Sequence, residues 1–409
     1  MDNGSRDNLV QSNEIIELLK NPIAHNFIAD HINEKPDSLA LTFKNKVPFD
    51  LTKLTQLLQL YHKAKHKIPL WVSSRCAMHS KSYEQCSHHE VSKFKSTLVK
   101  GNLLLDLTAG LGVDSYYFSK QFNNVVSLEK DTNTFAFNKY NTLKLKATNI
   151  SVIHGDLETF DFQNDYDVIY LDPDRRLSGQ TQLRSVETYS PDIFVWYKKL
   201  LTHCKTLLIK LSPMVDINYL EQQIPEITAT YVIAYKNEVK ELLLKIDSNA
   251  DNTVQQRIAV DINQHGTQQY IGKKNYEMGE LMASPKVILE PSKSIIKAEL
   301  GMVYAKLNKL KSIHPKSQYF FSDQTLDNFM GRQFEIIEDL PVQWSQIKKH
   351  LKARKIKAIN VAQRNFYHDV KAIRNKLNIK EGGTQFLLFT IDINHKARCF
   401  YCEPIVRVL

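Results

Sequence analysis

Between residue 102 and about residue 215, short apolar runs alternate with longer stretches of mixed polarity. Continuous apolar runs are typical of strands that are buried on both faces, and the mixed stretches between them have the length and pattern of helices. Strands separated by helices predict a parallel sheet with helices on both faces, an α/β fold. The apolar runs are LLLDL (103–107), VVSLE (125–129), ISVIHGD (150–156), YDVIYLDP (166–173) and TLLIKLSP (206–213).

Three further apolar runs follow too closely for a helix to lie between each pair. A short connection between neighbouring strands favours antiparallel pairing. We therefore expect these runs to close the sheet with antiparallel strands. They are TYVIAY (230–235), KELLLKI (240–246) and RIAVDI (257–262).

The chain before this region is polar and helix-like. Up to about residue 70, leucines recur at three- and four-residue spacing, which predicts amphipathic helices, and Pro69 ends the pattern. The segment 82–101 predicts one further helix that ends at Gly101. We expect a mostly helical N-terminal segment over residues 1–75 and the α/β domain over residues 76–275.

Near residue 280 the pattern changes again. A helical stretch over 294–310 and a basic helix over 367–379 are interleaved with strand-like runs, an order that fits a small α+β domain over residues 280–409. The strand-like runs are FEIIEDL (334–340), IKAINVAQ (356–363), TQFLLFTIDI (384–393) and RCFYCEP (398–404).

The positive charge of the chain is concentrated in this last region. The formal net charge is +10, and from residue 281 onward 22 Lys and Arg stand against 11 Asp and Glu, so the remainder is close to neutral. A polyanionic partner for the C-terminal third is one interpretation, and a solvated basic surface is the other.

The cysteines and histidines suggest neither disulfides nor a metal site. Five scattered cysteines do not form a disulfide framework. Cys399 and Cys402 are three residues apart in a predicted strand, so they should point to opposite faces. His88 and His89 lack further ligands at suitable spacing, and we interpret them as surface or packing residues.

Membrane insertion and secretion are also not indicated. No apolar run reaches the roughly 18 residues that cross a bilayer, and the N-terminus MDNGSRDNLV lacks the basic and apolar plan of a secretory signal. We expect a soluble cytoplasmic protein.

The first apolar run leads into a turn that contains two glycines. In an open parallel sheet, ligands bind where the chain leaves a strand for the next helix, and Gly110 and Gly112 allow the backbone to bend sharply and approach a ligand there. The dinucleotide pattern G-x-G-x-x-G would place a third glycine where Ser115 stands. A nicotinamide dinucleotide is therefore a poor fit to this loop.

Carboxylates stand at the ends of the predicted strands. Asp106 precedes the loop and Asp114 follows it, where they would repel linked phosphates but could receive an ammonium or hydroxyl groups. Glu129 can bind both hydroxyls of a ribose. Asp156 could accept from an adenine amino group, or it could only cap the helix that follows. A ligand with a cationic amine and a ribose fits this pattern best.

A second acidic motif, LDPDRR, ends the fourth apolar run. Asp172 could accept a hydrogen bond from the N–H of the group that is modified, and Pro173 would stiffen the backbone that aims it. Arg175 and Arg176 could bind a phosphate or stack on a base plane, or they could pair with nearby acids and only order the loop.

The loop LDLTAGLG, together with the acids of the second and third strands, resembles the class I S-adenosylmethionine-dependent methyltransferases. The resemblance implies a Rossmann-like sheet, S-adenosyl-L-methionine as cofactor and S-adenosyl-L-homocysteine as product. The segment just upstream should pack at the same end of the sheet and add two residues. The implied cofactor-binding residues are Asp106, Thr108, Ala109, Gly110, Gly112, Asp114, Glu129, Asp156, Gln85 and Ser87.

The motif LDPDRR resembles the D/N-P-P-Y/F/W element with which many nucleic-acid methyltransferases hold an amino nitrogen of a base. Asp174 and Arg175 replace the last two residues of that element, so no aromatic ring stands at the usual place. The resemblance implies Asp172, Pro173 and Arg175 as the catalytic group and names no general base.

Beyond residue 60, nearly all of the chain resembles a bacterial group of methyltransferases that carry a C-terminal THUMP-like domain. In THUMP proteins this domain binds RNA, so structured RNA such as tRNA or rRNA is the implied substrate. The motifs that carry the resemblance are EQCS (84–87), LTAGLGVD (107–114), LDPDRR (171–176), KLSPMVDI (210–217), NEVKELLL (237–244), LEPSKSIIKA (289–298), AQRNF (362–366) and IKEGG (379–383).

Basic and aromatic residues in the C-terminal region agree with an RNA partner. Cations can contact the phosphate backbone, and rings can stack on bases. The candidate RNA-binding residues are Arg175, Arg176, Arg364, Phe366, Lys371 and Arg374.

Two alternatives stay open at this point. One is a methyltransferase that acts on a protein or a small molecule, whose activity would persist without the basic C-terminal region. The other is a catalytically silent RNA-binding protein that keeps the fold, which the intact loop and acids argue against. No metal is expected in either case.

Overall fold

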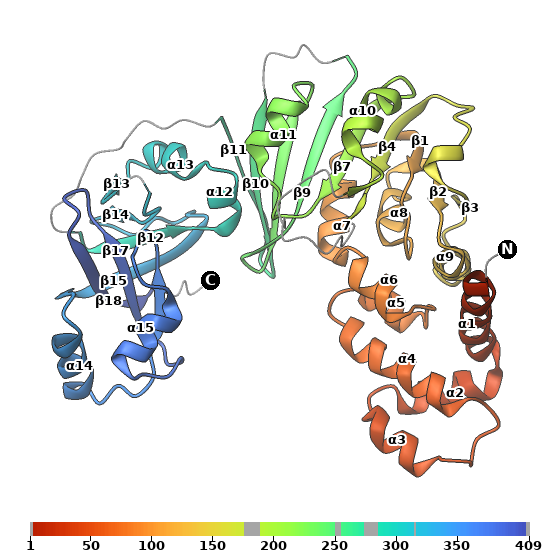
Figure 1. The fold of residues 1–409 in the computed structure, drawn as a ribbon, viewed down its shortest axis with the longest axis horizontal. Helices are drawn as coiled ribbons and strands as arrows, with labels where there is room; N and C mark the ends of the chain where they lie inside the picture. The colour runs from red at the N-terminus through yellow and green to blue at the C-terminus, as the bar shows by residue number, and fades with distance from the viewer. Residues whose placement is uncertain (1–2, 176–188, 250–254, 274–284, 315, 406–409) are drawn as a thin grey trace. The chain divides into compact units, whose positions relative to one another are not determined.

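The structure is a computed structural model that describes residues 3–175, 189–249, 255–273, 285–314 and 316–405 (Figure 1). The chain divides into two compact units, one formed by residues 1–228 with 242–254 and the other by residues 229–241 with 255–409. The domain boundaries expected near residues 75 and 280 stay predictions.

The first unit contains the parallel sheet that the apolar runs predict. Its strands lie in the order β9-β7-β4-β1-β2-β3, and all neighbours pair in parallel except β9, whose residues 242–247 run antiparallel to β7. The order reverses between β1 and β4, which makes this the switch point where ligands of such sheets bind. The strands are β1 (Gly101–Asp106), β2 (Phe122–Glu129), β3 (Ile150–His154), β4 (Tyr166–Leu171), β7 (Cys204–Leu211) and β9 (Glu238–Asp247).

The central strands are buried on both faces, as their continuous apolar sequence requires. Leu104 and Leu105 in β1, Ile169 and Leu171 in β4 and Leu208 in β7 are all inaccessible to solvent. Alternation of polar and apolar residues would have left one face of the sheet in water. The remaining elements of this part are α8 (Val113–Phe118), α9 (Thr132–Lys144), η1 (Leu157–Thr159), β5 (Asp174–Arg175), β6 (Tyr189–Ser190), α10 (Ile193–Leu201) and α11 (Ile217–Gln223).

The N-terminal helices pack against the glycine loop and the helices that follow it. Their apolar side chains form one core with Leu111 and Val113 of the loop region and with Phe137 of α9. Trp71 is fully buried, and its Nε1 donates to the carbonyl of Leu111 at 3.4 Å. Figure 1 shows α1 lying beside α9. These helices are α1 (Asn3–Lys20), α2 (Pro22–His31), α3 (Pro36–Thr42), α4 (Leu51–Ala64) and α5 (Pro69–Ser73).

The segment 82–101 forms no single helix, contrary to the prediction. The structure contains two short helices, α6 (Ser80–Gln85) and α7 (His89–Ser96), and β1 already begins at Gly101. His88 separates them, because its extended backbone interrupts the helix and its side chain accepts from the backbone N–H of Glu90 as the cap of α7. The break leaves Ser87 outside both helices, where its hydroxyl contacts Lys210 of β7.

One strand pairing in the second unit differs from the prediction. Here β8 (Ala229–Tyr235) and β10 (Gln256–Asn263) pair in parallel, whereas β11 (Gly266–Gly272) runs antiparallel to its neighbour β10. The chain returns along β9 before it enters β10, so β10 starts at the same end as β8. A returning strand replaces the crossover helix that parallel neighbours usually need.

The second unit also contains the predicted small α+β region, with a sheet of its own. Seven strands lie in the order β13-β14-β12-β15-β18-β17-β16, and α14 and α15 cover one face of it (Figure 1). The strands are β12 (Val287–Pro291), β13 (Lys311–Ser312), β14 (Phe320–Ser322), β15 (Gly331–Pro341), β16 (Asn360–Gln363), β17 (Phe386–Ile391) and β18 (Ala397–Pro404).

The helices of this region are α12 (Lys293–Lys297), α13 (Gly301–Leu307), α14 (Trp344–Ala353) and α15 (Val370–Leu377). The single helix predicted over 294–310 is therefore divided into α12 and α13, and Glu299 between them has a φ of 58° that a helix cannot hold.

Alternation along β18 separates its two cysteines. Cys399 packs in the core beneath α14 and α15, whereas Cys402 packs in the core on the opposite face. The two thiols therefore face away from each other, as the spacing predicts. Within the described residues, no helix has both the length and the apolar composition that crossing a membrane requires.

Candidate functional site

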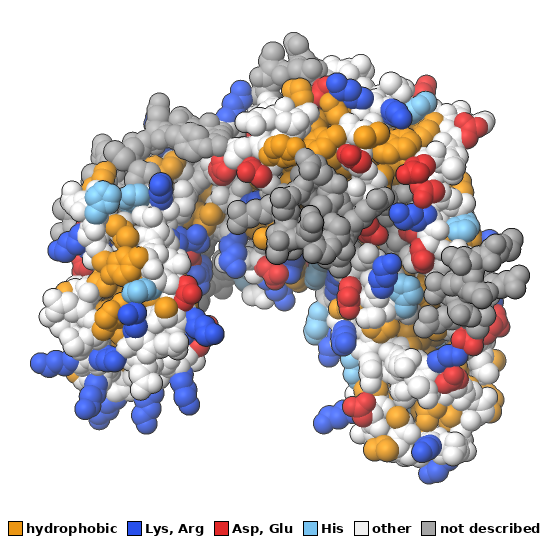
Figure 2. All heavy atoms as spheres, viewed as in Figure 1, with side chains coloured by type: hydrophobic (Ala, Val, Ile, Leu, Met, Phe, Trp, Pro, Cys, Tyr) orange, Lys and Arg blue, Asp and Glu red, His pale blue; other side chains and the backbone are white. Residues whose placement is uncertain are grey.

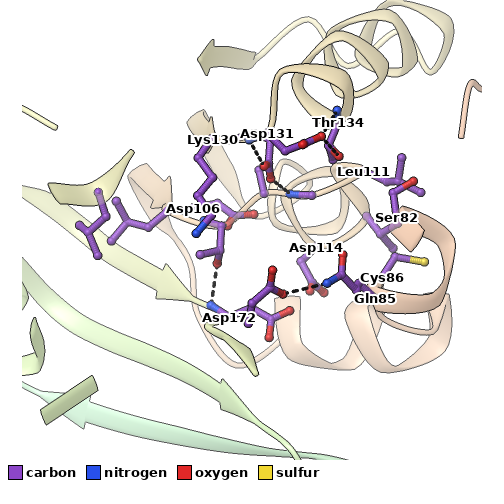
Figure 3. Close-up of a pocket in the computed structure, with 18 of the residues that line it drawn as sticks. Ser82, Gln85, Cys86, Asp106, Leu111, Asp114, Lys130, Asp131, Thr134 and Asp172 are labelled. Atoms are coloured by element: carbon purple, nitrogen blue, oxygen red, sulfur yellow. Dashed lines mark hydrogen bonds between the residues drawn. The ribbon is translucent and has the colours of Figure 1, made fainter. Parts of the chain in front are cut away.

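A pocket of about 370 Å³ lies at the carboxyl ends of β1, β2 and β4, at the switch point of the sheet (Figure 3). Its size is within the range of small-molecule sites. Residues from six segments of the first unit line it: 81–87 of the α6 region, 106–114 of the glycine loop, 129–134 after β2, 155–157 after β3, and 172–174 and 190–191 after β4.

The lining is strongly acidic. Such a site opposes linked phosphates and attracts a cationic ligand. The charged residues that line it are Asp106, Asp114, Glu129, Asp131, Asp156, Asp172 and Asp174 against Lys81 and Lys130.

The two loop glycines have left-handed backbone conformations. Gly110 has a φ of 55° and Gly112 a φ of 78°. A Cβ at Gly112 would also lie 2.5 Å from Oδ1 of the buried Asn138, so both backbone and space exclude a side chain there. At Gly110 no heavy atom would lie within 4 Å of a Cβ, which leaves this part of the loop open to a ligand.

Asp106 stabilises the glycine loop through hydrogen bonds to residues on both sides of the two glycines. It is fully buried, and its carboxylate accepts from Ser115 Oγ at 2.6 Å and from the backbone N–H of Thr108 at 3.1 Å. Burial raises the pKa of Asp106 to about 7. Ser115, which occupies the third glycine position of a dinucleotide loop, is thus the residue that anchors Asp106. Contact between Asp106 and a ligand amine stays a prediction.

Glu129 and Asp156 both line the pocket. Glu129 accepts from the backbone N–H groups of Gly110 and Asp131, each at 2.8 Å, and each of its oxygens keeps a further lone pair for a hydroxyl. Burial raises the pKa of Glu129. Asp156 accepts from the N–H of Glu158 at 3.1 Å and so caps η1. Its position in the lining is compatible with both roles that the sequence leaves open.

Asp114 is held by groups that the sequence analysis did not identify. Lys95 in α7 is completely buried and pairs with Asp114 at 2.9 Å. The hydroxyls of Ser87 and Tyr170 each donate to Asp114 at 2.9 Å. Burial alone would raise the pKa of Asp114, but Lys95 and Lys210 lower it to about 2.

The sequence contained one indication that Lys95 is buried. Lys95 lies next to Phe94 and one turn after Val91 on the apolar face of α7.

Asp172 lies at the end of β4, and its carboxylate is also paired. The backbone N–H donates to Thr108 Oγ1 at 2.6 Å, which connects LDPDRR to the glycine loop (Figure 3). The carboxylate forms an ion pair with Lys210 of β7, a second residue that the sequence analysis missed. Burial raises the pKa of Asp172 to about 6, although Lys210 and Lys95 oppose the rise.

The rest of LDPDRR contributes unequally to the site. Pro173 is buried and does not belong to the lining, whereas Asp174 does and accepts from Gln85 Nε2 at 3.2 Å. Figure 3 shows Gln85 beside Asp172 and Asp114. The side chain of Arg175 and all of Arg176 lie outside the described residues.

The candidate RNA-binding residues of the second unit are mostly engaged in the fold. Arg364 pairs at 3.0 Å with Glu290, which is buried. Arg374 pairs at 2.9 Å with Glu381. Phe366 packs against the core beneath α14 and α15. Lys371 is exposed. An RNA contact by any of them stays a prediction.

A cluster of lysines on and just after α14 was not singled out from the sequence. We call it the α14 lysine face, and Figure 2 shows basic side chains gathered there, at the lower left. Part of it borders a shallow hollow with Leu351, Ile356 and Leu377 in its lining. Its members are exposed and form no ion pair with a described residue: Lys348, Lys349, Lys352, Lys355 and Lys357.

Comparison with known proteins agrees with this architecture. A sequence profile of the family described as THUMP domain-like matches residues 331–404. No curated protein matches the sequence. The crystal structure of a candidate methyltransferase from Porphyromonas gingivalis W83 superposes with a TM-score of 0.85 at 23% identity and covers 96% of this chain and 99% of its own.

Two other solved structures match only weakly. A candidate class I S-adenosylmethionine-dependent methyltransferase from Listeria monocytogenes has a TM-score of 0.34 at 10% identity and covers 63% of this chain and 93% of its own. The M. jannaschii tRNA m1G37 methyltransferase has a TM-score of 0.30 at 13% identity and covers 41% and 51%. Scores this low carry no argument about the fold.

The protein therefore has the fold of the P. gingivalis protein over nearly the whole chain. It combines a large sheet typical of Rossmann-like methyltransferases with a C-terminal THUMP-like domain that has its own sheet. Both expectations of fold from the sequence are confirmed.

Proposed function

We propose that the protein is an S-adenosylmethionine-dependent methyltransferase that acts on structured RNA, such as tRNA or rRNA. The observation that carries the proposal is the acidic pocket at the switch point, with Asp172 beside the glycine loop. The methyltransferase fold and the THUMP-like domain support it.

The residues of the pocket fit this cofactor. Glu129 offers two carboxylate oxygens to the ribose hydroxyls, and Asp156 lies where it could accept from the adenine amino group. Gly110 leaves room for close approach, and Thr108 and Ala109 complete the loop. Asp114, Gln85 and Ser87 lie near Asp172, where we place the methionine end. The acidic lining complements both the ammonium and the sulfonium.

The cofactor, when bound, supplies a methyl group on a positively charged sulfur, and transfer leaves the C–S electron pair on that sulfur. The protein must hold the acceptor in line with this methyl group. We assign to Asp172 the binding of the acceptor N–H, whose proton its carboxylate can accept as the nitrogen gains a methyl group. Pro173 is assigned the stiffening of the turn, and Arg175 a contact with the acceptor.

An RNA acceptor is favoured by the charge of the second unit. The α14 lysine face is basic, exposed and lacks acidic partners among the described residues, as contact with a phosphate backbone requires. Arg176, Arg364, Phe366, Lys371 and Arg374 are proposed as further contacts. A methyltransferase that acts on a protein or small molecule remains the second candidate, because nothing in the pocket itself selects RNA.

Two measurements test the proposal. Calorimetry should detect binding of S-adenosylmethionine and weaker or absent binding of NAD. Mass spectrometry of nucleosides in total RNA, from cells with and without the gene, should show one methylated nucleoside that disappears with the gene. Cofactor binding with an unchanged nucleoside spectrum would favour the second candidate. Absence of cofactor binding would favour a silent RNA-binding protein.

A further inference from the structure

The wall of the pocket beside Asp172 contains a buried ion pair, Lys95–Asp114, and a partly buried one, Lys210–Asp172, joined by one hydroxyl. Ser87 Oγ donates to Asp114 at 2.9 Å and accepts from Lys95 Nζ at 3.0 Å and from Lys210 Nζ at 3.3 Å. A serine hydroxyl has one proton and two lone pairs, so these three bonds use its whole capacity. In this arrangement both lysine Nζ groups act as donors.

Lys210 is the member of this network that contacts Asp172. Its Nζ pairs with Asp172 Oδ2, and the two side chains are 13% and 26% exposed, so water screens the pair only weakly. Lys210 belongs to β7, the strand next to β4. Asp172 directly follows β4, so the two residues stand at the same end of two adjacent strands.

We propose that Lys210 is a positioning residue that keeps the Asp172 carboxylate ionised and aimed at the N–H of the methyl acceptor. The inference rests on the proposed function and deepens it, because it names the residue on which the acceptor side depends. Lys210 itself need not touch the acceptor, because it does not belong to the pocket lining, whereas Asp172 does.

The charges around Asp172 make Lys210 decisive. Asp106 in β1 and Asp114 in α8 both disfavour a further negative charge here, whereas Lys95 in α7 pairs with Asp114 and lowers the pKa of Asp172 less than Lys210 does. Among the side chains that the structure describes, Lys210 is the cation that contacts Asp172 directly. The pKa of Asp172 is already raised to about 6 by burial, and without Lys210 it must rise further. A smaller fraction of Asp172 would then be ionised at pH 7.

The experiment compares Lys210→Met and Lys210→Gln with the wild type in two ways. The first follows the titration of the Asp172 carboxyl by 13C NMR in protein labelled at aspartate, with Asp172→Asn to assign the signal. The second follows the pH profile of methyl transfer. We expect the Asp172 midpoint to rise by about one unit or more in both variants. The acid limb of the pH profile should move with it, and activity should recover at high pH.

Two controls separate this role from a structural one. Lys205→Met removes a lysine from the same strand that pairs with Asp167 outside the pocket, and it should leave the Asp172 midpoint unchanged. Lys210→Arg keeps the charge and should keep the midpoint within a few tenths of a unit. If the methionine variant fails to fold, the glutamine variant carries the same prediction.

The inference is overturned if the midpoint of Asp172 does not move in a folded Lys210 variant, or if activity falls equally at all pH values. Failure of the proposed function is a separate result. The wild type would then methylate no RNA at any pH, whereas the titration of Asp172 needs no substrate.

Discussion

The pocket of the first unit and the α14 lysine face of the second unit carry opposite charges that are held in opposite ways. In the pocket, Asp106 and Glu129 are buried and each accepts two hydrogen bonds from the protein. On the α14 lysine face, Lys352 and Lys355 are exposed and form no ion pair with any described residue. The pocket carboxylates are therefore held in place before any ligand binds, whereas the exposed lysine side chains can change conformation when a ligand binds.

This difference indicates two kinds of recognition. Desolvated charges with fixed partners are costly to bury and have little freedom to rearrange, so they select a ligand of one shape and charge. Exposed lysines cost little and tolerate many geometries, so they suit a long polyanion whose phosphates repeat. The proposed function, which combines binding of a small cofactor with binding of RNA through its phosphate backbone, calls for both.

The largest expected effect is on stability, and it concerns the buried ion pair beside the pocket. Lys95→Met leaves Asp114 buried without its cation, which should lower the free energy of unfolding by about 3–5 kcal/mol. Denaturant titration measures it. Lys93→Met, an exposed lysine of the same helix, should change stability by less than about 0.5 kcal/mol. Equal losses of unfolding free energy in the two variants would contradict the view that buried partners hold the pocket carboxylates in place.

The second prediction distinguishes a residue that binds the cofactor from one that binds the methyl acceptor. Asp172→Ala should lower kcat/KM for methyl transfer by about 10²–10⁴-fold, while the affinity for S-adenosylmethionine stays within roughly tenfold. Calorimetry and a methyl-transfer assay measure the two quantities on one preparation. If cofactor binding collapsed instead, Asp172 would be a cofactor ligand and not an acceptor group.

Glu129→Gln should weaken cofactor binding by about 10- to 100-fold, because hydrogen bonds to a charged group contribute about 1.5–3 kcal/mol. Glu158→Gln changes an exposed acid just after Asp156 and should leave the affinity unchanged. Calorimetry at one pH suffices. If Glu129→Gln left the affinity for S-adenosylmethionine unaltered, Glu129 would not be the residue that binds the ribose hydroxyls.

The smallest effect concerns the α14 lysine face. Changing Lys348, Lys349, Lys352 and Lys355 together to Gln should weaken RNA binding by roughly tenfold or less at moderate salt. It should also lower the slope of log K against log salt by about 0.7–0.9 for each phosphate that the variant no longer neutralises. Fluorescence anisotropy over a salt series measures both.

The matched control for this surface changes four exposed lysines of the N-terminal helical segment to Gln, with the same loss of charge: Lys44, Lys46, Lys63 and Lys65. We expect this variant to keep both the affinity and the slope. If the two sets behaved alike, RNA binding would depend on total charge and not on a defined face.

The sequence predicts the sheet and the acidic pocket for one shared reason. Apolar runs such as that of β4 identify buried parallel strands, and the carboxyl ends of such strands meet at one edge, so Asp106, Glu129 and Asp172 had to converge. Lys95 and Lys210 could not be found in this way, because their partners depend on how α7 and β7 pack in three dimensions.

Local exceptions account for the other differences. The cap at His88 and the left-handed Glu299 break two predicted helices, because single-residue conformations are invisible to a periodicity argument. The parallel pairing of β8 with β10 arises because a strand, not a helix, brings the chain back. The helix α14 was missed although its two buried residues, Ile347 and Leu351, are one turn apart.

The contact between Trp71 and the carbonyl of Leu111 makes the N-terminal helices part of the support of the glycine loop. Sequence changes within these helices can shift the loop without touching any group that meets a ligand. A loss of cofactor affinity therefore does not by itself locate a substitution in the pocket, because the glycine loop packs on the N-terminal helices.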